Sequence, residues 1–485
     1  MNLEHTYASS FPELATPAVP EIPAATTVLW INEDLAAELE LDATWLAGTD
    51  GLRWLTGGDE KTTALAYSGH QFGHLSPVLG DGRAHLIGEL PTSEKRVDIH
   101  FKGSGITPYS RPGSDGKAPL SAVWREAVIG EALHALGVPT SRALAVLETG
   151  ETVRRRSPLP EPAGILVRIA DSHLRVGTFQ YAHMNVGSDQ RIELAGYALS
   201  RHYPQVNPGD NPALTLLRLV AEHQAHLVAQ WMGLGFVHGV LNTDNVSISG
   251  QAIDFGPCAF IDGFSDEAVF SSIDRGGRYA YRNQPGITQW NLVRFAESLL
   301  DLIDPEKPNR AVHLATALLE HFEETYEDAR TRVFAAKLGI AVEGAAGAPY
   351  ERLVAFIDRT LDMLDEHTLD FTGFFRALTD TPDHLVELLP NSETLKSWLA
   401  DLATLRQDTG TAPGRAEELM QGANPVYIPR NLHLEAALRA VESGDTAPIL
   451  RLLGAVRQPF TRHSGLEDLE TAPARSRFFT SFCGT

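Results

Sequence analysis

The sequence predicts an α+β protein in which a sheet comes first and helices follow. Short strand-like runs between glycines, prolines and serines fill residues 67–120, and long helical patterns dominate from about Ala122 onward. Breaks rich in glycine, alanine and proline near residues 338–349 and 409–425 bracket a mostly helical carboxyl third. This order fits a two-lobed body with a helical extension better than an alternating βα fold.

The same patterns divide the chain into four segments. The first segment mixes a proline-rich extended stretch between Pro12 and Pro23 with a helical stretch near residues 32–46. We expect an amino-terminal extension over residues 1–60, an amino-terminal lobe over 61–165, a carboxyl-terminal lobe with a catalytic loop over 166–335, and a helical region over 336–485.

The composition excludes several classes of protein. The chain has 485 residues, of which 43% are hydrophobic and 21% charged, which is typical of a chain that buries a core. Its formal net charge of -22 repels phosphate backbones and anionic membrane surfaces, so we expect neither a nucleic acid nor a membrane as partner. With two cysteines, no stretch of ~18 apolar residues and no signal-like amino end, the expected location is the cytoplasm.

A glycine-rich turn precedes one of the predicted strands. In LGDGRAHLIGEL, Gly80 and Gly82 would let main-chain N–H groups approach a phosphate, and Arg83 adds a positive charge. Taken alone, the pattern is more typical of a plain hairpin, because short Gly-x-Gly turns are common. The residues that lie near the turn therefore decide between a phosphate site and a plain hairpin.

A strand lysine and a helix glutamate form the next candidate pair. In RVDIHFKGSG, polar and apolar residues alternate as in a half-buried strand, and Lys102 points away from the apolar face. In WREAVIGEALHALG, Glu126 lies on the apolar stripe of a helix that Gly137 would end, whereas Glu131 is turned away. A carboxylate that faces a core is costly without a cation, so we pair Glu126 with Lys102. A purely structural ion pair is the alternative.

Two further segments carry charged candidates. The loop ITPYSRPGSDGKAPLS contains Asp115 and Gly116 and is too rich in glycine and proline to be regular, so it could reach a ligand or be a solvated connection. Arg168 and Arg175, in GILVRIADSHLRVG, lie between the two predicted lobes. Arginines suit phosphate binding, although each taken singly is more typical of a surface position.

The richest stretch follows a predicted helix over residues 213–232. GFVHGVLNTDNVSISGQAIDFGPCAFID reads as a loop, a tight hairpin and a DFG triplet at residues 254–256. The serine-glycine turn of that hairpin would bring Asn245 and Asp254 out at one end. Their amide and carboxylate oxygens are hard ligands that suit Mg²⁺, which completes its shell with water and substrate phosphates.

The set of residues is the same in kind as that of protein kinases. Kinases pair a strand lysine with a helix glutamate, and they bind metal through an asparagine of the catalytic loop and the DFG aspartate. A lone DFG would be chance in a chain of this length. The ordered set of Lys102, Glu126, Asn245 and Asp254 instead predicts a kinase-like, two-lobed fold with a phosphate-chemistry site.

One position departs from the kinase pattern. Asn245 follows His238 by seven residues, as in H-R-D-x-x-x-x-N, but the position of the catalytic aspartate holds Val240. Asp244, beside Asn245, is the nearest carboxylate that could accept a hydroxyl proton or join the metal site. The sequence therefore predicts phosphate chemistry without the standard kinase base.

At this point the chain closely resembles the SelO (YdiU) family of pseudokinase-fold protein adenylyltransferases. The resemblance covers essentially the whole chain, in long blocks that keep their order. These blocks are YSGHQFGHLSPVLGDGRAHLIGE, KGSGITPYSRPGSDGKAPL, WREAVIGEALHALGVPTSRALA, VRIADSHLRVGTF, HGVLNTDNVSISGQAIDFGP, GRYAYRNQPGITQWNLVRFA and NPVYIPRN.

The resemblance implies that ATP binds flipped relative to kinases, so that its α-phosphate meets a Ser, Thr or Tyr hydroxyl of a protein. AMP is transferred and pyrophosphate leaves, with Mg²⁺ or Mn²⁺ as cofactor. It implies Asp244 as proton acceptor and Asn245 and Asp254 as metal ligands, while the support of Lys102 by Glu126 follows from the pairing argued above. The positions that match ATP-binding residues are Gly80, Gly82, Arg83, Lys102, Asp115, Gly116, Arg168, Arg175 and Asp254.

The carboxyl end carries a cysteine where members of this family have cysteine or selenocysteine. Some members bridge this residue to a cysteine of the activation segment. Here that segment, SDEAVFSSIDRGGRYAY, has serines and no cysteine, and Cys258 is the only intrachain partner that the sequence offers Cys483. We therefore expect a free terminal thiol rather than a redox switch.

Three functions stay open on the sequence alone. The first is a protein adenylyltransferase that uses ATP and acts on protein hydroxyls, for which we expect a monomer. The second is a kinase that transfers the γ-phosphate to a protein or small molecule. The third is an inactive nucleotide-binding scaffold, which Val240 favours and the retained metal ligands disfavour. The identity of protein targets cannot be read from the sequence.

Overall fold

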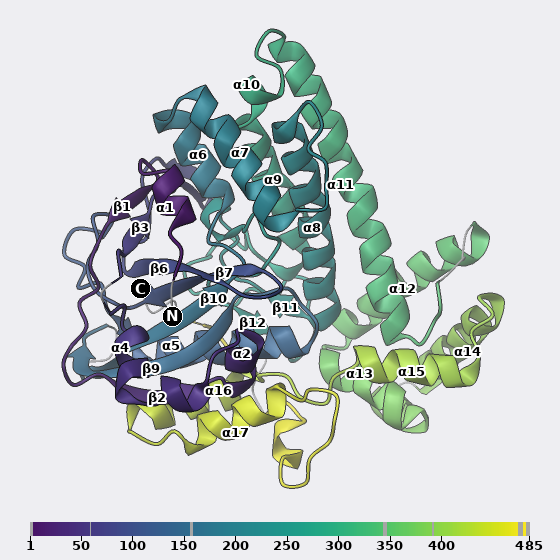
Figure 1. Cartoon of the computed structure of the whole chain (residues 1–485). Helices are drawn as coiled ribbons and strands as arrows, with labels where there is room; N and C mark the ends of the chain where they lie inside the picture. The colour runs from purple at the N-terminus through teal and green to yellow at the C-terminus, as the bar shows by residue number, and fades with distance from the viewer. Residues whose placement is uncertain are drawn as a thin grey trace.

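The computed structural model describes residues 3–58, 60–155, 159–342, 347–389, 392–473 and 479–481. It is a mixed structure in which a sheet-containing lobe lies beside a helical part, and a further group of helices extends to one side (Figure 1). In the described residues, no helix is both long and apolar enough to cross a membrane.

Within these residues, eight strands form one antiparallel sheet. Its order is β1-β3-β6-β7-β10-β9-β2, and β8 pairs with β10. The two edge strands therefore both come from the amino-terminal end of the chain. The strands of the sheet are β1 (Ala15–Pro17), β2 (Thr27–Ile31), β3 (Thr63–Leu65), β6 (Ala84–Pro91), β7 (Arg96–Lys102), β8 (Ala118–Pro119), β9 (Arg142–Val153) and β10 (Glu161–Ala170).

Strand β7 lies in the middle of the sheet and is buried on both faces. Val97, Ile99 and Phe101 pack into an apolar cluster with side chains of β9 and β10, as the alternation predicts. The prediction of a half-buried strand is wrong for the opposite face, because Asp98 and His100 are also buried. Polar side chains can lie inside when they have partners, and both do.

The helical pattern predicted from residue 122 onward conceals the two longest strands, β9 and β10. They pair with each other, and β10 pairs with β7 through Arg168 opposite His100 and Leu166 opposite Lys102. Alanine, leucine and glutamate in β9 favour helix by propensity, but pairing on both sides overrides that weak preference. The sheet lobe thus extends further along the chain than the pattern indicates.

Helices make up most of the remaining structure. They are α1 (Thr6–Ser10), α2 (Glu33–Glu38), α3 (Ala43–Leu46), α4 (Thr49–Trp54), α5 (Leu120–Ala135), α6 (Val176–Asn185), α7 (Ser188–His202), α8 (Pro212–Leu234), α9 (Gln284–Glu297), α10 (Leu300–Ile303), α11 (Pro308–Lys337), α12 (Ala348–Glu366), α13 (Phe371–Asp380), α14 (Ser392–Asp408), α15 (Pro413–Ala423), α16 (Asn431–Glu442) and α17 (Ala447–Val456). Short 3₁₀ turns are η1 (Thr243–Asn245), η2 (Tyr281–Asn283), η3 (Pro382–Glu387) and η4 (Glu467–Leu469), and two-stranded pairs are β4 (Gly69–Gln71) with β5 (His74–Ser76) and β11 (Phe236–Val237) with β12 (Ala259–Phe260).

Two predicted boundaries differ in the structure. The helical stretch near residues 32–46 is interrupted, because Glu40 adopts a φ of 59° and the Asp42 carboxylate caps a new helix, α3. The predicted break at 409–425 contains α15, which begins at Pro413, a residue that is well tolerated in the first helical turn.

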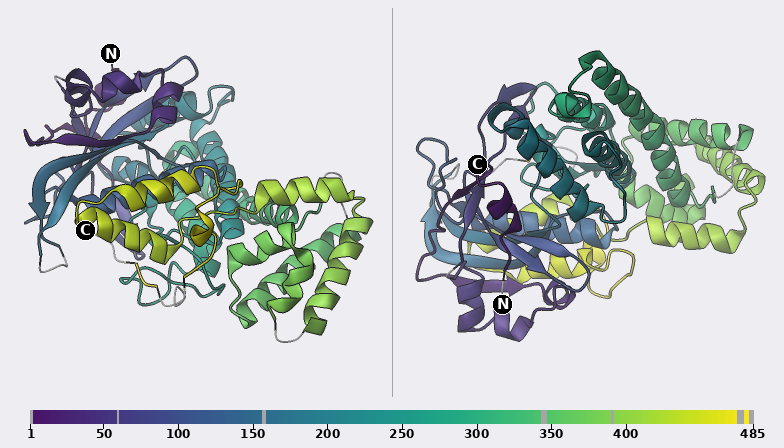
Figure 2. Two further views of the ribbon diagram at one scale, coloured as in Figure 1. Left: turned by 90° about the horizontal axis from the view of Figure 1, so that it is seen from below. Right: turned by 45° about the horizontal axis from the view of Figure 1, so that its top comes forward.

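Helix α5 is covered on one side by the sheet and on the other by the end of the chain. It contacts β9 and β10, and α16 and α17 pack against it. Figure 2 shows these two helices, in yellow, lying across the sheet lobe, while the green helices α12 to α15 form a group at its side. Arg125 of α5 forms an ion pair with Glu435 of α16, so the carboxyl-terminal region fixes the helix that carries Glu126.

Candidate active site

Lys102 is the cation at the end of β7 around which the site is built. Its Nζ lies 2.6 Å from Oε1 of Glu126 on α5 and 2.5 Å from Oδ1 of Asp254. The predicted pairing of Lys102 with Glu126 is therefore present in the structure. Both side chains are largely buried, so each needs the charge of the other.

Two arginines join Lys102 on the same carboxylate. Arg168 donates from a terminal nitrogen to Asp254 Oδ1 at 2.6 Å, and Arg175 donates to Asp254 Oδ2 at 2.8 Å. Each arginine side chain is 3% exposed, so the surface alternative is wrong for both. Burial by itself would raise the pKa of Asp254, but the three cations hold it well below its ordinary value.

Asp254 also has an unusual backbone. Its φ is 66°, in the left-handed region that residues other than glycine rarely adopt. A conformation of this kind persists when the surrounding contacts fix it, and here both carboxylate oxygens have cationic donors. The strained residue is thus the one on which the charges of the site converge.

The predicted catalytic loop, residues 238–245, lies directly beside these residues. Asn245 ends the 3₁₀ turn η1, and its side-chain amide donates to the carbonyl oxygen of Val240 at 2.8 Å, which leaves its own amide oxygen for another partner. Arg175 donates to the main-chain oxygen of Asp244 at 2.8 Å, so the same arginine contacts the loop and Asp254.

The hairpin predicted between Asn245 and Asp254 is wrong. Gly250 does adopt the left-handed φ of a turn, at 78°. The residues on the two sides of the turn, however, pair elsewhere: Ser247 bridges Arg175, and Ala252 bridges Thr140. These partners are close in space but distant in sequence, so a local pattern could not reveal them.

Asp244 is a buried carboxylate with a free oxygen. Its Oδ1 has no hydrogen-bond partner among the described residues. Burial first, and then the nearby Asp254, raise the pKa of Asp244 to about 6. Gly69 makes room for it, since a Cβ on that glycine would lie 2.3 Å from Asp244 Oδ1. A carboxylate in this environment can accept a proton near neutral pH.

His238 and Val240 have structural positions. The His238 ring is fully buried and hydrogen-bonds through Nε2 to the main-chain oxygen of Ile253, just before Asp254. Val240 packs half-buried against the core. These two positions of the kinase-like spacing therefore have packing roles next to the site, and neither supplies a base.

The glycine-rich turn lies next to the lysine. The carbonyl of Arg83 accepts the N–H of Gly103, the residue after Lys102, at 2.8 Å. Gly80 has a φ of 68°, and a Cβ there would lie 2.3 Å from the Tyr109 ring, so this position requires glycine. Gly82 lies in the same turn. The antiparallel pairing of β6 with β7, in which Ala84 is opposite Lys102, accounts for this proximity, so the plain-hairpin alternative stays open.

The loop with Asp115 and Gly116 makes contacts of its own. The Asp115 carboxylate, 41% exposed, forms an ion pair with Arg155 at 2.7 Å. The main-chain oxygen of Gly116 accepts the N–H of Gly105, three residues after Lys102. The structure thus ties this loop to the end of β7 but gives Asp115 partners other than the central cluster.

Hard oxygen donors are available for a divalent cation. In the described part of the chain, no group of three or more His, Cys, Asp or Glu side chains could hold a metal by itself. Asp254 and the amide oxygen of Asn245 would therefore share an ion with phosphate oxygens, and the buried, unpartnered Asp244 Oδ1 lies beside them. Such a donor set fits Mg²⁺, which usually keeps few protein ligands.

The two cysteines lie in different parts of the chain. Cys258 is fully buried, its thiol donates to the main-chain oxygen of Phe255, and burial raises its pKa to about 12. That environment disfavours the reactive thiolate. Cys483 lies outside the described residues, so the expected free terminal thiol stays a prediction.

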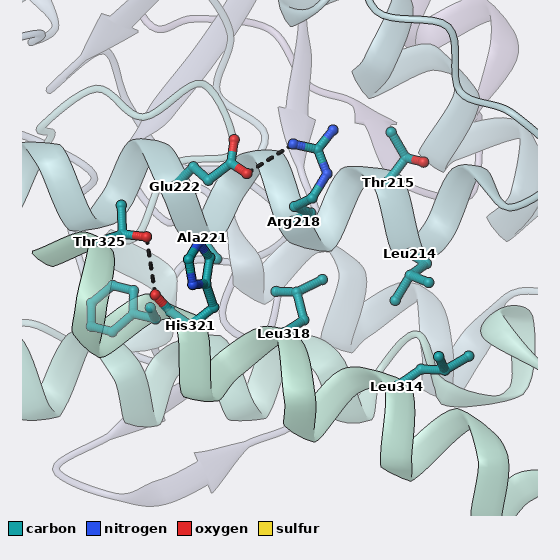
Figure 3. A pocket seen from close by; sticks show the side chains of 10 residues that line it. Leu214, Thr215, Arg218, Ala221, Glu222, Leu314, Leu318, His321 and Thr325 are labelled. Atoms are coloured by element: carbon teal, nitrogen blue, oxygen red, sulfur yellow. Dashed lines mark hydrogen bonds and ion pairs between the residues drawn. The ribbon is translucent and has the colours of Figure 1, made fainter.

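A cavity elsewhere in the molecule has a different character. It has a volume of about 330 Å³ and lies between α8 and α11, where Leu214, Leu314 and Leu318 face each other (Figure 3). Its charged pair, Arg218 and Glu222, is a neighbouring-turn ion pair of α8. None of the charged residues that converge on Asp254 lines this cavity.

Comparison with known proteins identifies similar chains. A model of the family described as "Protein adenylyltransferase SelO" matches residues 1–457. A protein from Rhodococcus jostii (strain RHA1) is 46% identical and covers 100% of this chain and 94% of its own. One from Mycobacterium sp. (strain KMS) is 46% identical, covering 100% and 99%, and one from Sphingopyxis alaskensis is 45% identical, covering 97% and 96%. All three are named "Protein nucleotidyltransferase YdiU".

Proposed function

The chain belongs to the SelO family of protein adenylyltransferases and is a nucleotidyltransferase, and we propose that it transfers AMP from ATP to Ser, Thr or Tyr hydroxyls of proteins. The observation that carries this proposal is the convergence of Lys102, Arg168 and Arg175 on Asp254, beside a catalytic loop in which Val240 replaces the kinase base. The three cations outnumber the two carboxylates that they contact, Glu126 and Asp254. Three cations gathered at one point suit a triphosphate, although the whole chain is acidic.

The nucleotide would lie between the glycine-rich turn and the catalytic loop. The main-chain N–H of Gly82 and the side chain of Arg83 would contact phosphates, with Asp115 and Gly116 at the outer end. Gly80 would shape the turn, because its own N–H donates to the main-chain oxygen of Tyr67 at 3.2 Å. Lys102, held by Glu126, and the two arginines would stabilise charge that develops during transfer. We take the flipped orientation of ATP, which presents its α-phosphate to the acceptor, from the resemblance to the family.

A divalent cation belongs to this proposal. Asn245 and Asp254 would hold Mg²⁺ or Mn²⁺, which would offset the negative charge of the triphosphate when bound. Arg175 contacts both the loop before Asn245 and the carboxylate of Asp254, and so it keeps the two ligands in a fixed relation.

Asp244 is the proposed proton acceptor. The acceptor hydroxyl oxygen forms a bond to the α-phosphorus, the bond from that phosphorus to the bridging oxygen of the β-phosphate breaks, and pyrophosphate leaves. The hydroxyl proton passes to Asp244 Oδ1, which has no competing hydrogen bond in the described structure. Positioning and charge stabilisation contribute most to transfers at phosphorus, so one weak base is sufficient.

We also propose that the fold is kinase-like and two-lobed. The sheet lobe with Lys102, helix α5 with Glu126, and the loop with Asn245 and Asp254 occur in the chain order of that fold. The other expectations belong to the same proposal: a cytoplasmic monomer that acts on proteins, with no nucleic acid or membrane as partner.

Labelled ATP tests the proposal directly. The purified chain and a mixed protein extract are incubated with ATP labelled on either the α- or the γ-phosphate, with Asp254→Ala as control. We expect label in protein only from α-labelled ATP and none with the variant. Label only from γ-labelled ATP would show a kinase, and binding of ATP without any transfer would show an inactive scaffold.

A further inference from the structure

A buried histidine lies against one of the site arginines. His100 on β7 is directly opposite Arg168 on β10, and the two side chains are 0% and 3% exposed. A terminal nitrogen of Arg168 donates to His100 Nδ1 at 3.1 Å. An arginine can only donate, so Nδ1 must carry the lone pair and the ring proton must be on Nε2.

The other side of the same ring faces the glycine-rich turn. His100 Nε2 lies 3.0 Å from Oδ2 of Asp81, the residue between the two glycines of the turn. Asp81 is fixed in turn, because Oδ2 also accepts the N–H of Leu65 at 3.1 Å, and its main-chain oxygen accepts the Thr107 hydroxyl at 2.5 Å. A continuous series of hydrogen bonds therefore runs from the turn through Asp81 and His100 to Arg168.

The surroundings keep the His100 ring neutral. Burial is the main cause that lowers its pKa, and the nearby Arg168 and Arg175 act in the same direction against Asp81. The ring of His173 stacks on it with centroids 4.1 Å apart and planes at 18°. A neutral ring with its proton on Nε2 is the form that can accept from Arg168 and donate to Asp81 at once.

The hydrogen bonds of Arg168 show why the neutral form of His100 matters for the site. One terminal nitrogen contacts Asp254, the other contacts His100, and Nε has no hydrogen-bond partner among the described residues. Asp254 is the carboxylate that a nucleotide and its cation would engage. Glu126 Oε2 lies 3.9 Å from the nitrogen that contacts Asp254, which is too far for a hydrogen bond. His100 is then the hydrogen-bond partner of Arg168 that does not compete for the ligand.

We propose that His100, oriented by Asp81, is a positioning residue that keeps the Arg168 guanidinium in place for phosphate when Asp254 engages the ligand. The inference rests on the proposed function and deepens it. It links the glycine-rich turn to the arginine through side chains. Asp81, between the two glycines, then has the role of orienting the His100 ring.

Two substitutions of His100 separate its two hydrogen bonds. His100→Asn keeps an acceptor near the position of Nδ1, whereas His100→Gln keeps a donor near Nε2 and removes the acceptor for Arg168. His85→Gln is the matched control, because His85 is a fully buried histidine of β6 that bonds to Ser104. We measure kcat and KM for ATP, and the melting temperature of each variant.

We expect His100→Gln to lower kcat by about tenfold, as the loss of a hydrogen bond to a charged group does. KM for ATP should change less than kcat, and His100→Asn should recover most of the rate. His85→Gln should lower the melting temperature to a similar extent without this loss. Equal losses in the two His100 variants, or losses no larger than in His85→Gln, would overturn the proposal.

A second variant covers failure to fold. If His100→Gln does not fold, Asp81→Ala removes the acceptor that orients the ring and should lower kcat in the same direction, and an unchanged kcat would overturn the proposal.

Wild-type protein is assayed with both labelled forms of ATP. If it transfers only γ-phosphate, the proposed function fails, yet the order of the variants is still tested on that transfer. If it transfers nothing, the affinities for α,β-methylene-ATP decide. His100→Gln should then bind more weakly than His100→Asn, by less than the tenfold expected for kcat, and equal affinities would overturn the proposal.

Discussion

Asp254 shows how a single residue depends on its neighbours. Its carboxylate receives three cationic donors from β7, β10 and the residue that precedes α6. Its left-handed backbone would be costly alone, and the ion pairs at both carboxylate oxygens offset that cost. Asp244 nearby is also buried, but its Oδ1 has no hydrogen-bond partner among the described residues, and burial outweighs the nearby Arg175, so its pKa is raised rather than lowered. The two neighbouring carboxylates therefore differ in how readily they take up a proton.

A single substitution tests the role of Asp244. We expect Asp244→Ala to lower AMP transfer by about 100-fold, the usual effect of losing a general base, and to change ATP affinity much less. Transfer of α-labelled phosphate and calorimetric binding of an ATP analogue give the two quantities. Equal losses in transfer and binding would indicate that Asp244 is instead a ligand of the metal-nucleotide complex.

Helix α6 is held by a close contact at its start. Helix α6 begins against the segment before β4, where the N–H of Ser68 bonds to the Gly177 oxygen at 2.9 Å. A Cβ on Gly177 would lie 2.0 Å from the Ser68 oxygen. This contact places the start of α6, and Arg175 just before it, beside the catalytic loop.

Gly177→Ala should therefore destabilise the chain by about 1–3 kcal/mol, because main-chain atoms cannot move aside cheaply. Gly196→Ala is the matched control, since Gly196 lies inside α7 with open space around it. Alanine there should stabilise the protein by about 0.5–1 kcal/mol. Urea unfolding measures both, and equal effects of the two substitutions would contradict the steric argument.

The contact between α11 and α13 contains a buried lysine. Lys337 Nζ lies 4.4 Å from the centroid of the Phe375 ring and 5.4 Å from that of Phe371. Burial lowers its pKa from 10.5 to about 7. Between these two values the unfolded chain binds more protons than the folded chain, so stability should rise with pH across that window.

Lys337→Met should remove this dependence. The lysine contributes a slope of up to about 1.4 kcal/mol per pH unit, and the gain of the variant should be largest at or below pH ~7 and fade toward pH ~10. Urea unfolding at several pH values measures the slope. Lys396→Met, at an exposed lysine, should leave it unchanged. A wild-type slope that persists in Lys337→Met would assign it to other groups.

At the scale of the whole molecule, the carboxyl-terminal region packs against the elements that carry the site. Arg430, fully buried, donates to Asp262 at 2.9 Å and to Asp370 at 2.8 Å. Asp262 follows the DFG triplet, and Asp370 caps α13. Arg125 and Glu435 make a second connection, from α5 to α16. The helical region thus holds both the segment after Asp254 and the helix of Glu126.

Arg430→Met tests that connection. The substitution removes this cation from two carboxylates, one of them fully buried, and should cost about 3–5 kcal/mol of unfolding free energy. Arg451→Met breaks an ion pair with Asp468 in which both side chains are exposed, and should cost less than about 1 kcal/mol. Denaturant unfolding compares them, and a similar small effect of both substitutions would contradict a role for Arg430 in joining the parts.

The sequence by itself determined the family of the chain and the central ion pair of the site. Periodicity placed Lys102 on a strand and Glu126 on a helix, and the cost of burying either charge alone predicted their ion pair, which the structure contains. The order of these residues with Asn245 and Asp254, and the long matching blocks, predicted the family to which the chain belongs. Each inference depended on patterns within a short window or on the order of motifs.

The tertiary structure alone decided how distant segments meet. Arg168 and Arg175 read as ordinary arginines until sheet pairing and the start of α6 directed both to Asp254. The partners of His100 lie 19 and 68 residues away, and those of Arg430 60 and 168 residues away. Such contacts depend on strand order, register and the return of the chain, which no local pattern specifies. The same cause hid β9 and β10, since pairing on both sides, rather than propensity, made them strands.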